Sequence, residues 1–263
     1  MSDFRDQMNN IIRLESTPSR IVSLVPSQTE LLHTLGLEDE VVGITKFCLY
    51  PNEWYRGKCR VGGTKNIDIH KVVDLKPDLI IGNKEENHKD NINDLLGVAP
   101  VWMSDIFNLE DALKMIESVS EMTGKVAEGK HLIEEIRAQF QMLANSDVVK
   151  ELKGKKVQYF IWHKPDMVAG KRTFIDVMLD ACGLINVTDV DRYPEVKLES
   201  SPDFIFLSSE PFPFKNKHVR YFQDAFPNAK IKLVDGEMFS WYGSRLLLAP
   251  SYFKDLLEEL SNQ

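Results

Sequence analysis

Two short hydrophobic runs, each introduced by Pro-Asp and each ending in polar residues, lie 125 positions apart in the chain (202 − 77). They are Pro77 to Asn83 (PDLIIGN) and Pro202 to Ser208 (PDFIFLS). A continuous apolar run of this length is typical of a strand buried on both faces, and its polar tail marks the carboxyl end of the strand. Because ligands of open α/β sheets sit beyond those ends, the repetition predicts two similar lobes whose facing strand ends form a ligand cleft.

Strand and helix patterns alternate around these runs. In the first half, strands are expected at 20–26, 41–47, 79–83 and 100–104, with helices near 70–75 and 90–96. Ser27 and Glu30 have the spacing of a capping box, which predicts a helix that stops at Gly36. In the second half, strands are expected at 157–162, 204–208 and 231–234, with helices at 174–182, capped by Thr173, and at 250–260. The alternation predicts a mainly parallel sheet in each half.

The middle of the chain has a different pattern. No proline occurs between Leu109 and Leu152, and apolar residues recur there at helical spacing. Gly124 divides this stretch into two helices, the second with room for more than twenty residues, or about 30 Å. We therefore expect three parts: an N-terminal α/β lobe at 1–124, a stiff bridging helix at 125–150 and a C-terminal α/β lobe at 151–263.

Charge and composition argue against several classes of function. The net charge is −8 and no basic run exceeds two residues, which argues against a nucleic-acid partner. No apolar stretch approaches the length of a membrane span, so membrane insertion is not expected. Residues 1–14 are polar and lack the apolar core of a secretory signal, which predicts a cytoplasmic protein, or a periplasmic one if the true start lies upstream. Three cysteines without a C-x-x-C pair favour reduced thiols over disulfides or structural zinc.

Three segments together with the long middle helix resemble the periplasmic-binding-protein-like receptors with a helical backbone. The segments are RIVSLVPSQTELLHTLGLEDEVVGIT from Arg20, VGGTKNIDIHKVVDLKPDLIIGN from Val61 and DGEMFSWYGSRLLLAP from Asp235. Members of that family are the solute-binding components of transporters for cobalamin, haem and ferric siderophores. The resemblance spans roughly residues 20–260, and the most similar branch is that of cobalamin-binding or helical-backbone metal receptors.

The resemblance implies a fold and a function. The implied fold is α/β, with two Rossmann-like lobes joined by one long rigid helix, in the class III, chelatase-like arrangement. The implied function is to clamp a metal chelate, such as a corrinoid, haem or a ferric siderophore, between the lobes, with an ABC transporter permease as partner and no tightly bound cofactor. Phe47 matches an aromatic of the cobalamin receptor, whereas Thr64 replaces its next one.

The resemblance is incomplete in other places. The acid and the arginine of the receptor's last loop are matched only in part, by Ser240 and Arg245. The two glutamates that the receptor presents to its transporter fall on His70 and Glu199, so one docking charge is absent. These departures weaken the expectation of both cobalamin and a transporter partner.

Candidate ligand contacts in the first lobe follow the second and third strands. Phe47 and Tyr50 are expected to stack on a flat ligand, with ordinary loop packing as the alternative. Cys48 is either a thiolate metal ligand or, the favoured reading, a buried structural residue. Gly63 permits close backbone approach and Lys65 offers a cation for a carboxylate or phosphate, although a simple turn explains both residues as well.

Further candidates follow the two Pro-Asp strands and the first strand of the second lobe. Glu85 and Glu210 occupy equivalent strand ends and are predicted to meet on a metal or on ligand donors, the alternative being solvated loop charges. Trp162 is a candidate for stacking on the ligand. His163 is either an axial metal ligand or, as is more usual for a lone histidine, structural. Arg192 and its neighbour Tyr193 are placed on the rim.

The segment 239–245 (FSWYGSR) carries the most site-like composition in the chain. It combines three aromatics, two serines and one arginine, which favours ligand contact over packing. The predicted ligand-binding set is Phe47, Tyr50, Gly63, Lys65, Glu85, Trp162, Arg192, Tyr193, Glu210, Trp241, Tyr242 and Arg245.

The sequence favours a receptor over an enzyme. No G-x-S-x-G, H-E-x-x-H or G-x-G-x-x-G motif occurs, so no catalytic residues are assigned, and no set of metal ligands is defined. Paired carboxylates remain open as catalysts, because spacing in sequence does not give spacing across a cleft. The alternative function is a cytoplasmic enzyme or metallochaperone on the same fold.

Overall fold

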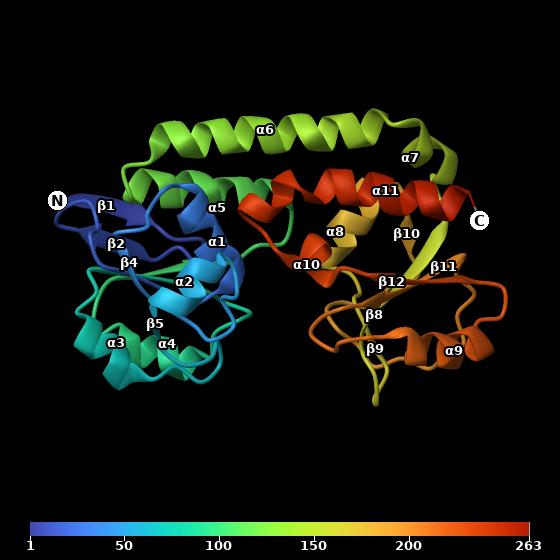
Figure 1. The fold of residues 1–263 in the computed structure, drawn as a ribbon, viewed down its shortest axis with the longest axis horizontal. Helices are drawn as coiled ribbons and strands as arrows, with labels where there is room; N and C mark the ends of the chain where they lie inside the picture. Colours follow the sequence, from blue (N-terminus) through green and yellow to red (C-terminus); the bar gives the residue numbers. More distant parts are fainter. Residues whose placement is uncertain (263) are drawn as a thin grey trace. The chain divides into compact units, whose positions relative to one another are not determined.

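The computed structural model describes residues 1–262, and these residues form two compact units (Figure 1). Unit 1 consists of residues 1–106, 110–134 and 242–245. Unit 2 consists of residues 107–109, 135–241 and 246–263. The short segment 242–245 is therefore a return of the chain to unit 1 between two parts of unit 2.

Unit 1 is built on a five-stranded sheet with the order β5-β4-β3-β6-β7, in which every pairing is parallel. Its strands are β3 (Ile21–Ser23), β4 (Val41–Ile44), β5 (Cys59–Arg60), β6 (Leu79–Asn83) and β7 (Val101–Ser104). Its helices are α1 (Pro26–Thr34), α2 (Asn52–Gly57), α3 (Ile69–Leu75), α4 (Lys89–Leu95) and α5 (Leu109–Met122). An antiparallel hairpin of β1 (Ser2–Arg5) and β2 (Ile11–Leu14) precedes the sheet.

Helices cover both faces of this sheet, with α3 and α4 side by side on one face and α5 on the other (Figure 1). Alternate residues of a strand point to opposite faces. On the α3 and α4 side, Val22 and Ile80 pack with Val72 of α3 and Leu95 of α4. All five residues of β6 are buried, as expected for a strand covered on both faces.

Unit 2 has a second five-stranded sheet with the order β10-β8-β11-β12, parallel throughout this path, and β9 joins β8 as an antiparallel partner. Its strands are β8 (Lys156–Trp162), β9 (Met167–Val168), β10 (Ile185–Asn186), β11 (Phe204–Ser208) and β12 (Lys230–Val234). Its helices are α7 (Asp147–Leu152), α8 (Phe174–Ala181), α9 (Asn216–Ala225), α10 (Gly236–Ser240) and α11 (Ala249–Ser261), and a 3-10 turn, η1 (Ser244–Leu247), precedes α11. The predicted α/β class with mainly parallel sheets is confirmed.

Aromatic side chains fill the core of unit 2 on both faces of its sheet. Phe160 of β8 packs against Phe222 of α9, with ring centroids 4.6 Å apart. The next residue back along β8, Tyr159, faces the other way and lies 5.2 Å from Phe239 of α10. Thr173 caps α8 as predicted, because its side chain accepts the amide hydrogen of Asp176.

Helix α6 (Val126–Asn145) begins in unit 1 and ends in unit 2, since the division falls between Glu134 and Glu135. It follows Gly124, which adopts φ 72°, as the sequence predicted for the break. The proline-free stretch, however, contains a third helix, because the chain breaks again at Ser146 before α7. A stiff bridging role for 125–150 stays a prediction. None of the helices in residues 1–262 has both the length and the apolarity to cross a bilayer.

The two Pro-Asp pairs perform the same structural task. The backbone of Asp78 pairs with Arg20 at the start of β3, and its carboxylate accepts the amides of Ser19 and Arg20, each at 2.8 Å. In unit 2, Asp203 pairs in the same way with Lys156 and accepts its amide at 2.7 Å. Each aspartate therefore ties the amino end of its strand to the neighbouring parallel strand.

Three local predictions were wrong. The first strand was predicted at 20–26, but β3 ends at Ser23 and Pro26 already begins α1. Ser27 and Glu30 do not form a capping box, because α1 already begins at Pro26 with the apolar Val25 in the N-cap position. Strand β4 ends at Ile44 and not at Phe47, because the Thr45 hydroxyl lies 3.1 Å from the Cys48 sulfur and turns the chain.

Asp203 makes acid stability a test of the Pro-Asp arrangement. Its pKa is held below the ordinary 3.8, chiefly by the hydrogen bond from the Lys156 amide. A carboxyl whose folded pKa is lowered stabilises the fold above its unfolded pKa, and this stabilisation disappears as the pH falls through the folded value. We expect Asp203→Asn to lower the free energy of unfolding at pH 7 and the two proteins to converge as the pH falls below about 4. Urea unfolding at a series of pH values measures this, and parallel curves for the two proteins would contradict it.

Candidate functional site

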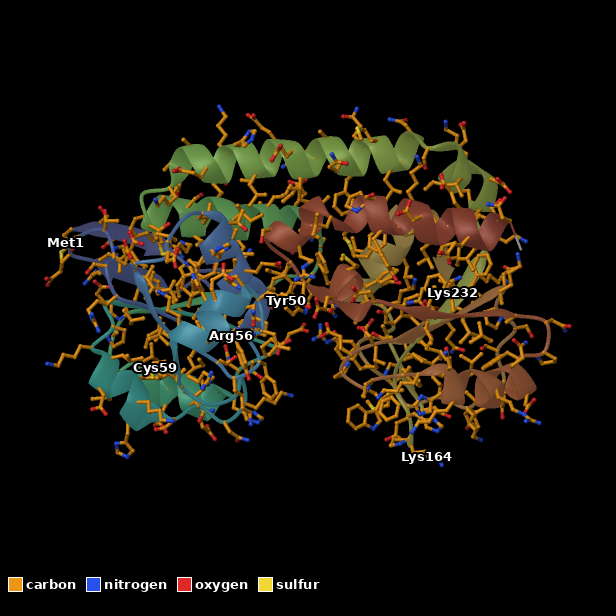
Figure 2. All side chains as sticks on the ribbon, in the orientation of Figure 1. Met1, Tyr50, Arg56, Cys59, Lys164 and Lys232 are labelled. Atoms are coloured by element: carbon orange, nitrogen blue, oxygen red, sulfur yellow. The ribbon has the colours of Figure 1, made fainter. Side chains whose placement is uncertain are left out.

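The loop that follows β4 exposes three large apolar side chains within four residues. Phe47 is 52% exposed, Leu49 50% and Tyr50 45%. Figure 2 labels Tyr50 at an edge of unit 1, apart from Arg56 and Cys59. Exposed apolar side chains at the carboxyl end of a parallel sheet are placed where such folds bind ligands. We call residues 45–51 the aromatic loop.

The interior of the aromatic loop is polar and fixed. The Cys48 sulfur is buried and lies 3.1 Å from the hydroxyls of both Thr29 and Thr45. Burial raises the pKa of the Cys48 thiol, which keeps it protonated and unsuited to binding a metal as thiolate. The structural reading of Cys48 therefore holds, and the residue anchors the loop from which its neighbours project.

The predicted glycine site lies beneath Phe47. The Lys46 amide donates to the Gly62 carbonyl at 2.7 Å, and a Cβ on Gly63 would come within 3.1 Å of the Phe47 ring. Gly63 is buried, so it makes room for the ring of Phe47 and does not itself lie open to a ligand. Lys65 is exposed in the same turn, and the Lys46 ammonium lies 5.1 Å from the centroid of the Phe47 ring.

Two buried asparagines shape the loop that carries Glu85. The Asn83 side chain accepts the amides of Glu85 and Glu86 at 2.8 and 3.1 Å. The Asn87 side chain accepts the Asn83 amide at 2.8 Å and donates to the Thr64 carbonyl at 2.9 Å. Glu85 is exposed at the tip of this loop, and the asparagine network joins it to the glycine turn. The sequence analysis missed this network, although an Asn at each end of a five-residue loop is a turn signal.

Arg245 makes a buried ion pair with Glu30 of α1. Its Nε and Nη2 donate to the two carboxylate oxygens of Glu30 at 3.0 and 2.9 Å. The Arg245 side chain is only 9% exposed and that of Glu30 20%. The guanidinium also lies 4.9 Å from the centre of the Tyr50 ring. Arg245 is thus engaged by the protein through Nε and Nη2, and its contact with a ligand stays a prediction.

Most of the segment 239–245 packs into the protein. Phe239 is fully buried in the core of unit 2, and Tyr242 is buried in unit 1. Gly243 adopts φ 109° and lies against α1, where a Cβ would come within 3.2 Å of the Ser27 carbonyl. The ring of Tyr242 is therefore part of the packing of unit 1, and a ligand contact for it stays a prediction. Trp241 alone among the three aromatics is partly exposed.

In unit 2 the structure joins two predicted site residues directly. The Trp241 indole N–H donates to Glu210 Oε1 at 3.1 Å, and the Ser240 hydroxyl donates to the same oxygen at 2.6 Å. Gly236 permits this approach, since a Cβ there would lie 2.6 Å from Glu210 Cγ. Glu210 therefore orients the indole of Trp241. It belongs to a different unit from Glu85, and a meeting of these two carboxylates stays a prediction.

The end of β8 presents one exposed tryptophan above an aromatic cluster. Trp162 is 39% exposed and packs edge-on against Phe212 at 5.6 Å. The neighbouring His163 is enclosed, with its Nδ1 only 2.6 Å from Asp166, which also accepts the Tyr221 hydroxyl. His163 is therefore structural, as the more usual reading held, and is not placed as an axial ligand.

The last two predicted contacts lie in the loop that crosses beside β9. Arg192 donates to the Arg172 carbonyl at 3.0 Å, and its guanidinium lies 5.5 Å from the centroid of the Tyr193 ring. Both side chains are half-buried. A ligand role for them stays a prediction. Within residues 1–262, no three His, Cys, Asp or Glu side chains gather in a way that would hold a metal ion.

The comparisons with known proteins agree with this geometry. A model of the periplasmic binding protein family matches residues 21–216, which is most of the chain. The chain belongs to this family. The predicted resemblance to periplasmic-binding-protein-like receptors is confirmed.

Several curated relatives match at low identity over most of the chain. An uncharacterized ABC transporter substrate-binding lipoprotein, YvrC of Bacillus subtilis, is 27% identical, with 97% of this chain and 86% of the relative covered. A vitamin B12-binding protein of Vibrio campbellii is 27% identical, with 72% and 70% covered. A cobalamin-binding protein of Halobacterium salinarum is 26% identical, with 78% of this chain and 56% of the relative covered.

Solved structures share the fold. The periplasmic vitamin B12 binding protein BtuF of Vibrio cholerae superposes with a TM-score of 0.80 at 23% identity, covering 94% of this chain and 99% of that one. The periplasmic heme-binding protein RhuT of Roseiflexus sp. RS-1 gives 0.79 at 21% identity, covering 93% and 98%. The predicted class III fold is thereby confirmed.

The prediction of a cytoplasmic protein is wrong. It rested on the polar composition of residues 1–14, but these residues form the β1–β2 hairpin of unit 1 and so reflect folding and not targeting. The family is one of periplasmic binding proteins, and the Bacillus subtilis relative is a lipoprotein.

The ion pair changes what is expected of Arg245→Ala. Removing the guanidinium leaves the partly buried Glu30 carboxylate without its bidentate partner, and breaking a buried pair from one side costs about 3 kcal/mol. We expect Arg245→Ala to lower the free energy of unfolding by about that amount and Trp241→Ala by less, since Trp241 is partly exposed. Chemical denaturation of both variants measures this. A loss below about 0.5 kcal/mol for Arg245→Ala, the range of ordinary surface changes, would contradict it.

Proposed function

We propose that this chain is the solute-binding receptor of an ABC-type uptake system, acts outside the cytoplasm, and binds a large, flat metal chelate, first of all a corrinoid. It binds this ligand without chemical conversion, and the ligand is its cargo and not a resident cofactor. The partner that follows from this role is the permease of the transporter.

The observation that carries the proposal is the aromatic loop. Its three exposed apolar side chains lie on a loop whose backbone is held by the buried Cys48 and by the hydrogen bond from the Lys46 amide to the Gly62 carbonyl. A rigid loop that displays apolar area is suited to a broad ligand surface, because the side chains lose little entropy on binding. Lys46 within the loop and Lys65 in the glycine turn supply positive charge for polar groups at the edge of such a ligand.

The corrinoid is favoured by the curated relatives. Two of the relatives described above carry names that state vitamin B12 or cobalamin binding, at 26–27% identity over most of this chain. In unit 2, Trp162 at the end of β8 and Trp241 at the end of α10 offer further aromatic surface. Family membership supports the transporter role, and the name of the Bacillus subtilis relative supports a location outside the cytoplasm.

A thermal-shift panel tests the ligand class. The purified protein is heated with cyanocobalamin, hydroxocobalamin, haemin and several ferric siderophores. A ligand present at 100 times its dissociation constant adds about 2.7 kcal/mol of stability, which is a clear rise in melting temperature. Recovery of each ligand unchanged after incubation separates a receptor from an enzyme. If no ligand shifts the melting temperature, or if one is converted, the proposal fails.

Phe47→Ala tests the aromatic loop itself. Truncating an exposed anchor that stacks on the ligand is expected to weaken binding by about 1 to 3 kcal/mol. Stability is expected to change by less than about 1 kcal/mol, because half of the ring is already exposed. Leu96→Ala is the matched control, since Leu96 is an apolar residue of unit 1 with 61% exposure. Isothermal titration with the ligand from the panel gives both affinities, and equal affinities for the two variants would place the ligand elsewhere.

Trp241 is tested by a pair of variants. Trp241→Phe removes the N–H donor to Glu210 and keeps an aromatic ring, whereas Trp241→Ala removes both. If the ring stacks on the ligand, Trp241→Ala loses about 1 to 3 kcal/mol of binding free energy and Trp241→Phe loses less than half of that. Equal losses in the two variants would assign the effect to the hydrogen bond with Glu210, and unchanged affinity in both would remove Trp241 from the site.

A further inference from the structure

We infer that Glu30 and Arg245 form a charge-selecting pair for the site: Arg245 positions the Tyr50 ring, while Glu30 neutralises the guanidinium beneath it. Arg245 then gives a chelate whose edge carries carboxylates no advantage over one whose edge carries neutral groups, such as amides. This inference rests on the proposed function, since it concerns the ligand that the aromatic loop binds.

The geometry shows a guanidinium committed to a protein carboxylate. Arg245 donates through Nε and Nη2 to both oxygens of Glu30, which is the bidentate arrangement that arginine forms with carboxylates. A ligand carboxylate that sought the same edge of Arg245 would have to displace Glu30. The ion pair therefore occupies the arginine edge that is best suited to binding a ligand carboxylate.

The same guanidinium contacts the aromatic loop at Tyr50. It lies 4.9 Å from the centre of the ring, within the range of a cation–π contact. Arg245 is 9% exposed at its side chain, whereas Tyr50 is 45% exposed. The buried Arg245 therefore contacts a ring that is itself exposed, and we treat Arg245 as a positioning residue that acts through the ring.

The pair joins distant parts of the sequence. Glu30 lies on α1, Tyr50 on the aromatic loop, and Arg245 on the segment 242–245, which returns to unit 1 from unit 2. Gly243 allows that segment to lie against α1, because a Cβ there would come within 3.3 Å of the Leu31 side chain. This return of the chain to unit 1 places the Arg245 guanidinium against the Tyr50 ring.

Other charges near the aromatic loop remain in every variant of the pair. Lys46 lies over Phe47, Lys65 is exposed in the glycine turn, and Glu85 is exposed on its own loop. In every variant, these charges change the binding free energy of an anionic ligand, relative to a neutral ligand of the same shape, by the same amount. A change in the ratio of two affinities therefore reports on Glu30 and Arg245 alone.

The test uses two probes that differ by one charge. Cyanocobalamin carries peripheral amides, and in its monocarboxylates one amide is hydrolysed to a carboxylate. Titration of wild type and variants with both probes gives a selectivity ratio. Should the ligand panel select haem instead, haem and its dimethyl ester are the corresponding pair.

Glu30→Gln keeps an amide oxygen to accept from Arg245 but removes the negative charge. A guanidinium that is no longer neutralised is then expected to strengthen binding of the most responsive monocarboxylate by about three- to tenfold relative to cyanocobalamin. Arg245→Gln leaves the negative charge of Glu30 without its guanidinium partner. It is therefore expected to weaken binding of the monocarboxylate relative to cyanocobalamin. The double variant restores neutrality, so its ratio is expected to return to that of wild type, while cyanocobalamin binds less tightly because Tyr50 has lost its support.

The control is Glu128→Gln, which removes an exposed carboxylate of α6 within unit 1 and changes the net charge equally. Melting curves establish that each variant is folded at the temperature of the titration. If wild type binds no probe, the proposed function fails. If wild type binds but Glu30→Gln leaves the ratio unchanged, or shifts it no more than Glu128→Gln does, the charge-selecting role is wrong and the pair is only structural.

Discussion

Burial of the parallel strands on both faces is the constraint on which the rest of this structure depends. Strands β6 and β11 are buried along their whole length, so neither can place a functional side chain on a sheet face. Polar chemistry is confined to the loops at the strand ends, where backbone groups lose their sheet partners and must be satisfied by side chains. The Asp residues of the two Pro-Asp pairs satisfy such backbone groups at the amino ends, and the buried Thr45 and Asn83 side chains do so at carboxyl ends.

The candidate site consists of loops at the carboxyl ends of the strands, each held by a polar side chain. Thr45 hydrogen-bonds within the aromatic loop, Asn83 and Asn87 hold the loop of Glu85, and Glu210 holds the indole of Trp241. In each case a buried or half-buried polar group fixes a loop whose exposed residue faces solvent. A ligand that meets such loops finds surfaces already ordered, so less binding free energy is lost to ordering them.

Local patterns predicted the elements that depend on local physics. The strands at 79–83 and 204–208 and the Thr173 cap were predicted at their observed positions, because continuous apolar runs and caps are encoded by neighbouring residues. Side-chain roles set by distant partners were predicted poorly. Glu30 has the spacing of a capping residue, yet it pairs with an arginine 215 positions away. Residues 1–14 have the composition of a polar tail, yet they form a hairpin.

Composition was a weak guide to the segment 239–245 for the same reason. Its aromatics were expected to act together, but one is core of unit 2, one is core of unit 1 and only Trp241 is partly exposed. A segment that passes from one packed unit to another needs apolar residues for both, and a charged residue among them is retained only with a partner. Arg245 satisfies this requirement with Glu30, at a point where the guanidinium also meets Tyr50. The ion pair that this segment needs for folding therefore also places a guanidinium against the exposed Tyr50 of the aromatic loop, and the proposed charge-selecting role would link the stability of the segment to ligand selectivity.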